Sequence, residues 1–528
     1  MTLSFLWSVV NDDVYTTLFT TLGVILIGYF IWLAFGIHSE LKKLGHIPGT
    51  WQVWFSPIKI PFFAPYLYLG SMGSIPELAK TLGDPETQTL RISLAQRSII
   101  WVSDPEMLKE LLITKANHFS KPKLIYETFN PFDKGNNVLT APHTEEWKKH
   151  FKICSPGFSS KNLEFMCQIS VESTDLMFKK WDEQLSQEGS CFVLNVGDYS
   201  DITLDVLGKA GFGVDFGIFS SNEKGRQLRQ SMDIIMRRGM VLKRFVRNYP
   251  FLYQLLSKWS GATQALETCS KILDQIIHQR REQVQQKNQM MESQNTMDEY
   301  ERNDILSLLV EANTNENLLT DDELKSNAFI LTLAGHETTS TLLQWTTFEL
   351  SQRPEVQKKL QNEVTRVLNG RNPTYHDFDS LEYVNAVIME VLRTHPPVVG
   401  VAKQVSKKDT TLGKYQIPKG SFINVFILNV HKKESIWKNA NEFDPERFKD
   451  AETRNRVQHD FTWMPFSMGN RKCIGYRFSL LEACMILTKL VQRYEFVLLN
   501  DEKDPVGCSV RVVQRPTNLK VAVSKREN

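Results

Sequence analysis

The distribution of apolar and polar residues sets a short apolar segment near the N-terminus apart from the rest of the chain. From Val14 to Ile37, about 24 residues pass without a charge. At about 1.5 Å per residue, a helix of this length crosses the roughly 30 Å core of a bilayer. We expect one transmembrane anchor here. A cleaved signal peptide is the alternative, but it needs basic residues ahead of a shorter apolar core, and no Lys or Arg occurs before Lys42.

The charges that flank this segment predict its orientation. Asp12 and Asp13 precede it, and Lys42 and Lys43 follow it, so the positive-inside rule places the residues after 41 in the cytosol. The endoplasmic reticulum is the membrane expected in a eukaryote. We divide the chain into a short lumenal N-terminus, an anchor, a linker with basic residues and a proline, and one large domain, in this order: residues 1–13, 14–37, 38–50 and 51–528.

Proline residues shape the segment that follows the anchor. Pro48 makes a stiff break between the anchor and the domain. Pro57, Pro61 and Pro65 exclude a second spanning helix. Two locations stay open for the aromatic side chains of this segment, the membrane interface and the protein core. These side chains are Trp51, Trp54, Phe55, Phe62, Phe63, Tyr66 and Tyr68.

Helical periodicity dominates the large domain, and the strand-like runs, such as 90–102 and 510–523, are short. The polar stretch 282–303 is nearly free of aliphatic residues and predicts a loop. The most informative predicted helix covers 321–352; Thr320 and Glu323 form a capping box before and within its first turn, and an Arg-Pro pair ends it. We expect an α+β domain, mainly helical with small sheets.

Charge and cysteine content exclude some classes of protein. The 62 Lys and Arg residues against 60 Asp and Glu residues leave a net charge of +2, which gives no global field for binding nucleic acid. The 7 cysteines form no C-x-x-C pair, so neither a zinc site nor a redox dithiol is predicted. A reduced compartment fits this pattern, and most of the cysteines are expected to be small buried apolar residues.

One cysteine lies in a motif with chemical meaning. Cys473 belongs to the run F-S-M-G-N-R-K-C-I-G, which starts at Phe466 and directly precedes a predicted helix. The partial positive charge and free N–H groups of a helix N-terminus stabilise a thiolate, the form of cysteine that ligates iron. Gly469 and Gly475 let the backbone approach a flat cofactor, Arg471 can pair with a carboxylate, and the phenylalanine can screen the sulfur from water.

The pattern F-x-x-G-x-R-x-C-x-G resembles the haem-binding loop of the cytochromes P-450 and matches it at every fixed position. The resemblance extends over most of the chain after the anchor and is to the membrane-bound eukaryotic, fungal-like type. It implies the cytochrome P-450 fold, with residues 51–528 as a haem-thiolate catalytic domain, haem b as the cofactor and Cys473 as the axial iron ligand. It also implies a monooxygenase that uses dioxygen to oxidise a lipophilic molecule.

A second landmark lies in the middle of the long predicted helix. The run A-G-H-E-T-T, which starts at Ala334, resembles the family's oxygen-activation segment, and the resemblance assigns proton delivery to Glu337 and Thr338. Gly335 and the threonine hydroxyls are expected to weaken the helix locally. A zinc-binding H-E-x-x-H motif is excluded, because Ser340 stands where the second histidine would be.

A third landmark is an ion-pair motif. Glu390 and Arg393 stand at i, i+3 spacing, which in isolation is a weak helix salt bridge. The resemblance assigns both, together with Arg447, to a buried network that supports the haem loop, in which loss of one partner would leave a buried charge unpaired.

The resemblance also implies contacts with the haem propionates. Arg471 and Trp147 take this role in the family, and Lys403 stands where an arginine is common. The sequence departs from the family four residues after the tryptophan, where Phe151 replaces the usual arginine. Three basic residues nearby are open as replacements: Lys148, His150 and Lys152.

The implied substrate pocket is apolar, which favours a terpenoid, a steroid or a fatty acid. Gly211-x-Gly213 lacks the third glycine of a dinucleotide fingerprint, so it does not predict a nicotinamide-binding segment. Electrons must therefore come from a separate NADPH-cytochrome P-450 reductase, with cytochrome b5 as a second candidate donor. Two alternatives remain, a haem- or sterol-binding membrane protein without turnover and an isomerase of the same fold. The expected pocket residues are Ile125, Phe129, Phe132, Ala334, Val398 and Val399.

Overall fold

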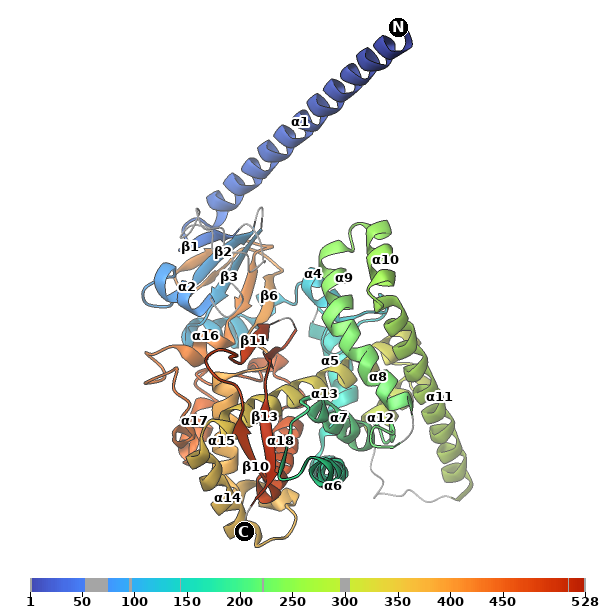
Figure 1. Ribbon diagram of the computed structural model, residues 1–528, viewed down its shortest axis with the longest axis vertical. Coiled ribbons are helices and arrows are strands. Elements are labelled where there is room, and N and C mark those ends of the chain that lie inside the picture. The colour runs from blue at the N-terminus through green and yellow to red at the C-terminus, as the bar shows by residue number, and fades with distance from the viewer. Residues whose placement is uncertain are drawn as a thin grey trace.

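The computed structural model shows a mainly helical domain from which one long N-terminal helix projects (Figure 1). Small sheets lie near the base of that helix and beside the C-terminus. The structure describes residues 2–52, 75–94, 97–142, 144–220, 223–294, 304–510 and 512–526.

The helices were predicted from the periodicity and are the main component. They are α1 Thr2–Leu44, α2 Ile75–Leu82, α3 Pro105–Lys109, α4 Lys123–Tyr126, α5 Thr144–Cys154, α6 Ser160–Glu188, α7 Gly197–Val206, α8 Glu223–Ile234, α9 Met240–Val246, α10 Pro250–Trp259, α11 Ala262–Gln294, α12 Ile305–Thr314, α13 Asp321–Ser351, α14 Pro354–Leu368, α15 Glu382–Thr394, α16 Ile427–Lys432, α17 Ala451–Val457 and α18 Tyr476–Arg493.

The strands are short and form small sheets. One sheet has the order β1-β2-β3-β9-β6-β4, a second the order β10-β13-β5, and two hairpins pair β7 with β8 and β11 with β12. The bounds are β1 Gly49–Gln52, β2 Leu90–Leu94, β3 Arg97–Val102, β4 Phe119–Ser120, β5 Cys191–Val193, β6 Val401–Val405, β7 Thr410–Leu412, β8 Tyr415–Ile417, β9 Phe422–Val425, β10 Tyr494–Leu498, β11 Gly507–Val510, β12 Gln514–Thr517 and β13 Val521–Lys525.

Helix α1 is longer than the predicted anchor. Within the described residues it is the helix long and apolar enough to cross a membrane, over Thr20–Leu44, and its most apolar window contains no buried residue. The helix ends at Leu44, as the proline ahead predicts, and Leu44 and Ile47 are both buried in the core of the domain. The carbonyl of Pro48 accepts a hydrogen bond from the Arg91 N–H at 2.8 Å. The segment after the helix is therefore part of the domain.

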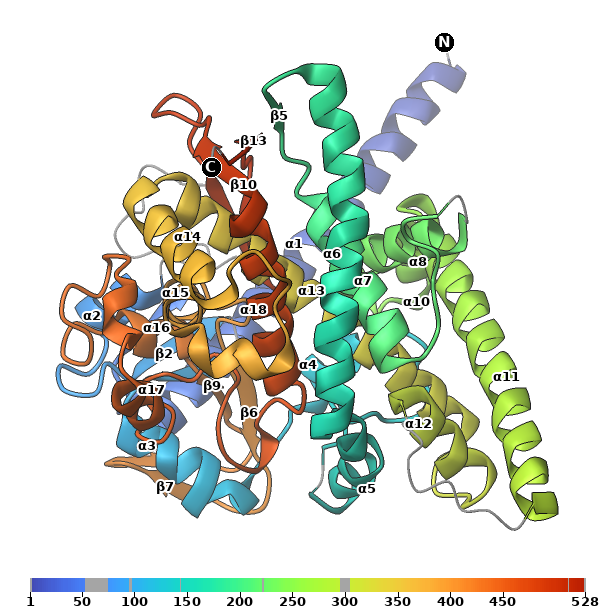
Figure 2. The same ribbon diagram turned by 90° about the horizontal axis from the view of Figure 1, so that it is seen from below.

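Helix α13 runs through the domain and contacts both halves of its core (Figure 2). Its predicted capping box is present: Thr320 Oγ1 accepts from the Glu323 N–H at 3.2 Å, and the Glu323 carboxylate accepts from the Thr320 N–H at 3.0 Å. One part of it packs with α11 and α12, another part packs with α15 and α18, and α7 also packs along it.

Two predictions from the sequence need comment. The loop predicted at 282–303 is wrong for its first part, because α11 continues to Gln294. Val284 is buried against the neighbouring helices, and the Gln, Glu, Lys and Met residues beyond it favour helix. Residues 295–303 and most of the aromatic segment after Gln52 lie outside the described residues. The strand-like runs are confirmed by β2, β3, β12 and β13.

Candidate active site

The Cys473 loop is a tight backbone turn ahead of α18. The Cys473 N–H donates to the Phe466 carbonyl at 2.9 Å and closes the loop. Gly469 has a φ of 75°, and a Cβ on it would lie 2.4 Å from the Leu112 carbonyl oxygen, so only glycine fits there. A Cβ on Gly475 would meet only Phe158, at 3.5 Å. Contacts within the chain therefore require a glycine at position 469. They do not require one at position 475.

The Cys473 side chain is accessible although protein surrounds it. The side chain is exposed, although surrounding protein raises its thiol pKa by burial, with the Gly475 N–H, Lys472 and Lys121 acting in the opposite direction. A thiol that is both accessible and largely desolvated is open to solvent on one side and covered by protein on the others. Most of the other cysteines, such as Cys154 and Cys484, are buried, as predicted.

A buried ion-pair network lies behind the loop. The Arg393 guanidinium binds both oxygens of Glu390, at 2.7 and 2.8 Å, and both side chains are fully buried. Arg447 lies 3.5 Å from the same carboxylate. Arg393 also donates to the carbonyl of His431 at 2.8 Å. The His431 ring then accepts from the Met464 N–H at 2.9 Å, and burial lowers the pKa of His431 to about 3, so the ring is neutral and able to accept.

This network reaches the cysteine loop through its backbone. Met464 lies two residues before Phe466, and the indole of Trp463 donates to the Met389 carbonyl on α15 at 3.0 Å. The structure thus brings together the three charged residues predicted for this network. His431 and Trp463 were not predicted, because the sequence does not reveal which side chain bridges two distant segments.

Three cations gather on the open side of the loop. Burial and the charge of Arg471 lower the pKa of Lys403 to about 8, and burial, Arg471 and Lys403 lower that of Lys121. Among the described residues, neither lysine has a carboxylate as ion-pair partner; Lys121 donates instead to the Leu139 carbonyl at 2.5 Å. Arg471 lies over the ring of Trp147, 4.5 Å from its centroid. These cations, held beside an open thiol, fit a cofactor that carries an iron and two carboxylates.

The three basic residues considered as replacements for the missing arginine have other surroundings. Lys148 pairs with Glu145 on the surface, and Lys152 is exposed. The His150 ring accepts from the Asn327 amide at 3.0 Å, and burial lowers its pKa to about 4. Phe151 packs against Trp147 with ring centroids 4.9 Å apart. Lys121, which sequence reasoning missed, is the additional cation beside Arg471.

The oxygen-activation segment lies in an unbroken part of α13. The expected local weakening at Gly335 does not interrupt the helix; a Cβ there would lie 3.0 Å from Leu207, so the glycine allows close packing. Thr338 Oγ1 donates to the Ala334 carbonyl at 2.8 Å, and Ala334 is exposed on the same face. Thr339 faces α18 instead, where its hydroxyl lies 3.1 Å from that of Ser479.

Glu337 points to a third side of this helix. It is buried, and its carboxylate lies 2.6 Å from the guanidinium of Arg515 on β12 and 3.8 Å from the ring of His336. No bond joins it to Thr338 among the described contacts. The two residues predicted to act together are thus neighbours in sequence that point in different directions.

The expected pocket residues separate into two groups. Phe129 and Phe132 pack at the edge of the core around α11, α12 and α13, and the Phe132 ring meets that of Phe329 at 5.4 Å. Val512 and Val513, from the turn before β12, join this core and were not predicted. Val399 packs instead in another cluster with Trp101 and Phe426. Ile125 on α4 and Val398 after α15 are partly buried.

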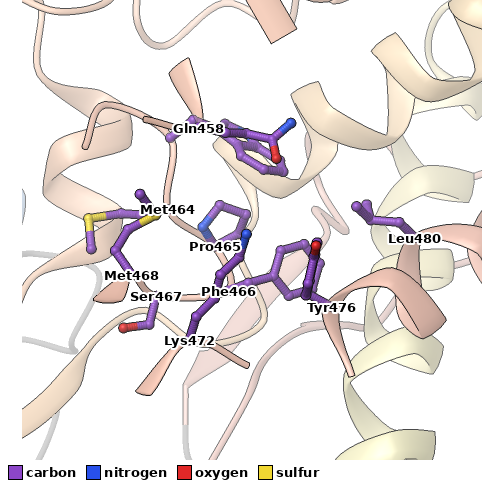
Figure 3. Close-up of a pocket in the computed structure, with 10 residues that line it drawn as sticks. Gln458, Met464, Pro465, Phe466, Ser467, Met468, Lys472, Tyr476 and Leu480 are labelled. Carbon is purple, nitrogen blue, oxygen red and sulfur yellow. The ribbon is translucent and has the colours of Figure 1, made fainter. Parts of the chain in front are cut away.

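A separate surface pocket lies beside the cysteine loop (Figure 3). Phe466 and Tyr476 turn their rings toward each other there, with centroids 6.3 Å apart. None of the expected substrate-pocket residues lines it. The lining residues are Gln458, Trp463, Met464, Pro465, Phe466, Ser467, Met468, Lys472, Tyr476 and Leu480.

Comparison with known proteins assigns the family. The description Cytochrome P450 matches residues 56–523. The chain is 31% identical over 410 residues to an 11-oxo-beta-amyrin 30-oxidase of Glycyrrhiza uralensis, covering 75% of this chain and 73% of the relative. It is 30% identical to secologanin synthase 2 of Catharanthus roseus, covering 75% and 73%. It is 27% identical to cytochrome P450 3A11 of Mus musculus, covering 91% of both. The chain therefore belongs to the cytochrome P450 family, as an oxygen-incorporating oxidoreductase whose family implies a haem ligated by a cysteine thiolate.

Proposed function

We propose that this protein is a membrane-anchored monooxygenase that binds haem b through Cys473 and oxidises a lipophilic small molecule. In the overall reaction one oxygen atom of dioxygen enters a C–H bond and the other leaves as water, with two electrons from NADPH and two protons. The observation that carries the proposal is the exposed Cys473 side chain near the buried lysines Lys121 and Lys403 and the partly buried Arg471. A thiolate-ligated haem supplies the oxidising chemistry when bound.

Residues of the chain bind the cofactor, handle protons and restrict the access of water. Arg471, Lys403 and Lys121 would hold the propionates, and Trp147 supports Arg471 by stacking. On α13, the Thr338 hydroxyl orders the protons on the distal side, and Glu337 relays protons from solvent. Phe466 lies against Tyr476 and Trp463, which restricts the access of water to the sulfur.

The substrate class follows from the lining and from the relatives. The predicted pocket residues Phe129 and Phe132 pack in one apolar cluster with Phe329 and Val513, which supports an apolar substrate. Two relatives are named for work on an oxo-beta-amyrin and on secologanin, both terpenoids. We infer that a terpenoid is the first class to test, followed by steroids and fatty acids.

The reaction requires an external electron donor. We infer that an NADPH-cytochrome P-450 reductase supplies the electrons, with cytochrome b5 as a second donor. The apolar helix α1 supports a membrane location, and the charge bias around it favours a cytosolic domain, as expected for a protein of the endoplasmic reticulum. Domain and reductase then face the same compartment.

Reconstitution tests the function directly. Purified protein with haem, a eukaryotic NADPH-cytochrome P-450 reductase, lipid and a panel of triterpenoids, steroids and fatty acids should consume NADPH and oxygen with formation of a hydroxylated product, identified by mass spectrometry. A haem- or sterol-binding protein without turnover would show spectral binding shifts and no product. An isomerase of the same fold would convert a peroxide substrate without consuming NADPH.

Removal of residues 1–41 is expected to release most of the protein from membranes while haem uptake is retained. The cut leaves Leu44 and Ile47 in place, and these are the buried apolar contacts of this segment with the domain. The measurement is the distribution between membrane and soluble fractions, together with the spectrum of the reduced carbon monoxide complex. A soluble protein without haem would show that the domain depends on its anchor, contrary to this prediction.

A further inference from the structure

Glu337 has an ion-pair partner that the family motif does not contain. The Arg515 guanidinium lies 2.6 Å from Glu337 Oε1, and the carboxylate is nearly buried. The other end of the same guanidinium lies 3.8 Å from Asp233 on α8. Titratable groups from three elements thus face this carboxylate or its partner: His336 on α13 itself, Arg515 on β12 and Asp233 on α8.

The position of Arg515 is fixed by the strand that carries it. The preceding residue, Gln514, donates its N–H to the Pro397 carbonyl at 2.8 Å. The Gln514 carbonyl accepts from the Trp345 indole at 2.8 Å, and Trp345 lies on α13, two turns beyond Glu337. The backbone of β12 is therefore anchored to the same helix that carries the oxygen-activation segment, which holds the guanidinium in register with the carboxylate.

The ion pair decides where the carboxylate points. Successive helix residues are about 100° apart around the axis, and Thr338 uses its hydroxyl on the face it shares with Ala334. Arg515 draws Glu337 toward β12, away from that face. A buried carboxylate that loses a counter-charge is costly, so without Arg515 this side chain would change its direction.

We propose that Arg515 is a positioning residue, which holds the Glu337 carboxylate in a fixed direction, toward β12, for the relay of protons from solvent. The inference rests on the proposed function. It predicts that Arg515 acts on catalysis through Glu337 and not through substrate binding or haem binding.

The test compares single and paired variants in the reconstituted enzyme. Arg515→Met should lower the product formed per NADPH about tenfold, within the range of losses typical for groups that support a proton-delivering or ligating side chain. Arg515→Lys keeps the positive charge but changes the donor geometry, and its product per NADPH should be within about threefold of wild type. In a Glu337→Gln background, Arg515→Met should cause no further loss, because the paired variants isolate the interaction between the two residues.

Arg353→Met is the matched control. Arg353 forms an ion pair with the buried Glu349 on the same helix, about 18 Å along the axis from Glu337. This variant breaks an Arg–Glu pair of α13 without touching the oxygen-activation segment, so its product per NADPH should stay within about twofold of wild type. An equal loss in both variants would mean that the ion pairs only stabilise the helix, and would overturn the proposal.

A second measurement does not depend on turnover. The C–O stretching frequency of the reduced carbon monoxide complex responds to charges on the distal side, and it should shift in Arg515→Met but not in Arg353→Met. An unchanged frequency together with an unchanged coupling ratio would overturn the role of Arg515. A wild-type protein that binds carbon monoxide but forms no product would contradict the proposed function alone, since the frequency comparison still decides the role of Arg515.

Discussion

Cys473→Ala is expected to abolish the red-shifted band of the reduced carbon monoxide complex and all product formation. That band reflects charge donation from a thiolate to the iron. Cys473 is the cysteine at the N-terminus of α18, next to buried cations and open on one side. Cys473→His should also lose the band, because an imidazole can ligate iron but donates less charge. The measurement is the difference spectrum of the reduced protein with carbon monoxide, at matched protein concentration.

The control for this variant is a cysteine of similar exposure. Cys191 lies exposed on β5, and Cys191→Ala should keep both the band and the activity. A red-shifted band that survives in Cys473→Ala would show that another residue ligates the iron. Loss of the band in both variants would point to a folding defect.

Thr338→Ala is expected to uncouple electron transfer from product formation by about 100-fold or more in rate, while haem content and substrate binding stay nearly unchanged. Groups that deliver or position protons typically contribute about 100 to 10,000-fold in rate. Truncation of one helix threonine costs on the order of 1 kcal/mol in stability. Among the described contacts the Thr338 hydroxyl donates to the carbonyl of its own helix, so its loss breaks no tertiary hydrogen bond within the described part of the chain. The electrons should appear in hydrogen peroxide.

Two further variants separate chemistry from packing at this site. Thr338→Ser keeps the hydroxyl and should retain most of the coupling. Thr339→Ala removes the neighbouring hydroxyl, which faces Ser479 on α18, and should leave the ratio of product to NADPH close to wild type. If Thr338→Ala kept the wild-type ratio, Thr338 would be a packing residue and the protons would arrive by another route.

The features that depend on short stretches of sequence were predictable. The capping box of Thr320 and Glu323 and the stop before Pro354 set both ends of α13 correctly, because caps are formed by residues a few positions apart. The i, i+3 pair of Glu390 and Arg393 likewise has the expected geometry. The family, the fold class and the apolar N-terminal helix also followed from motifs and hydropathy.

The features that depend on distant segments were not predictable. Lys121, His431 and Arg515 each act on a residue more than thirty positions away, and no local pattern marks them. The polar run before Gln294 looked like a loop because its composition is hydrophilic, yet α11 extends through it. The composition of a segment indicates how much apolar surface it can bury. A helix, however, can extend into a polar segment once the packed segment before it has nucleated the helix.

The pairing of β5 with β13 affects how the protein folds during its synthesis. Cys191–Val193 forms its hydrogen bonds with residues 522–524, among the last described positions of the chain. During synthesis, β5 would expose that edge until β13 leaves the ribosome. Long-range pairings of this kind slow folding and leave edges open to aggregation. The yield of folded protein in a cell should therefore depend on chaperones that protect the edge of β5 until β13 pairs with it.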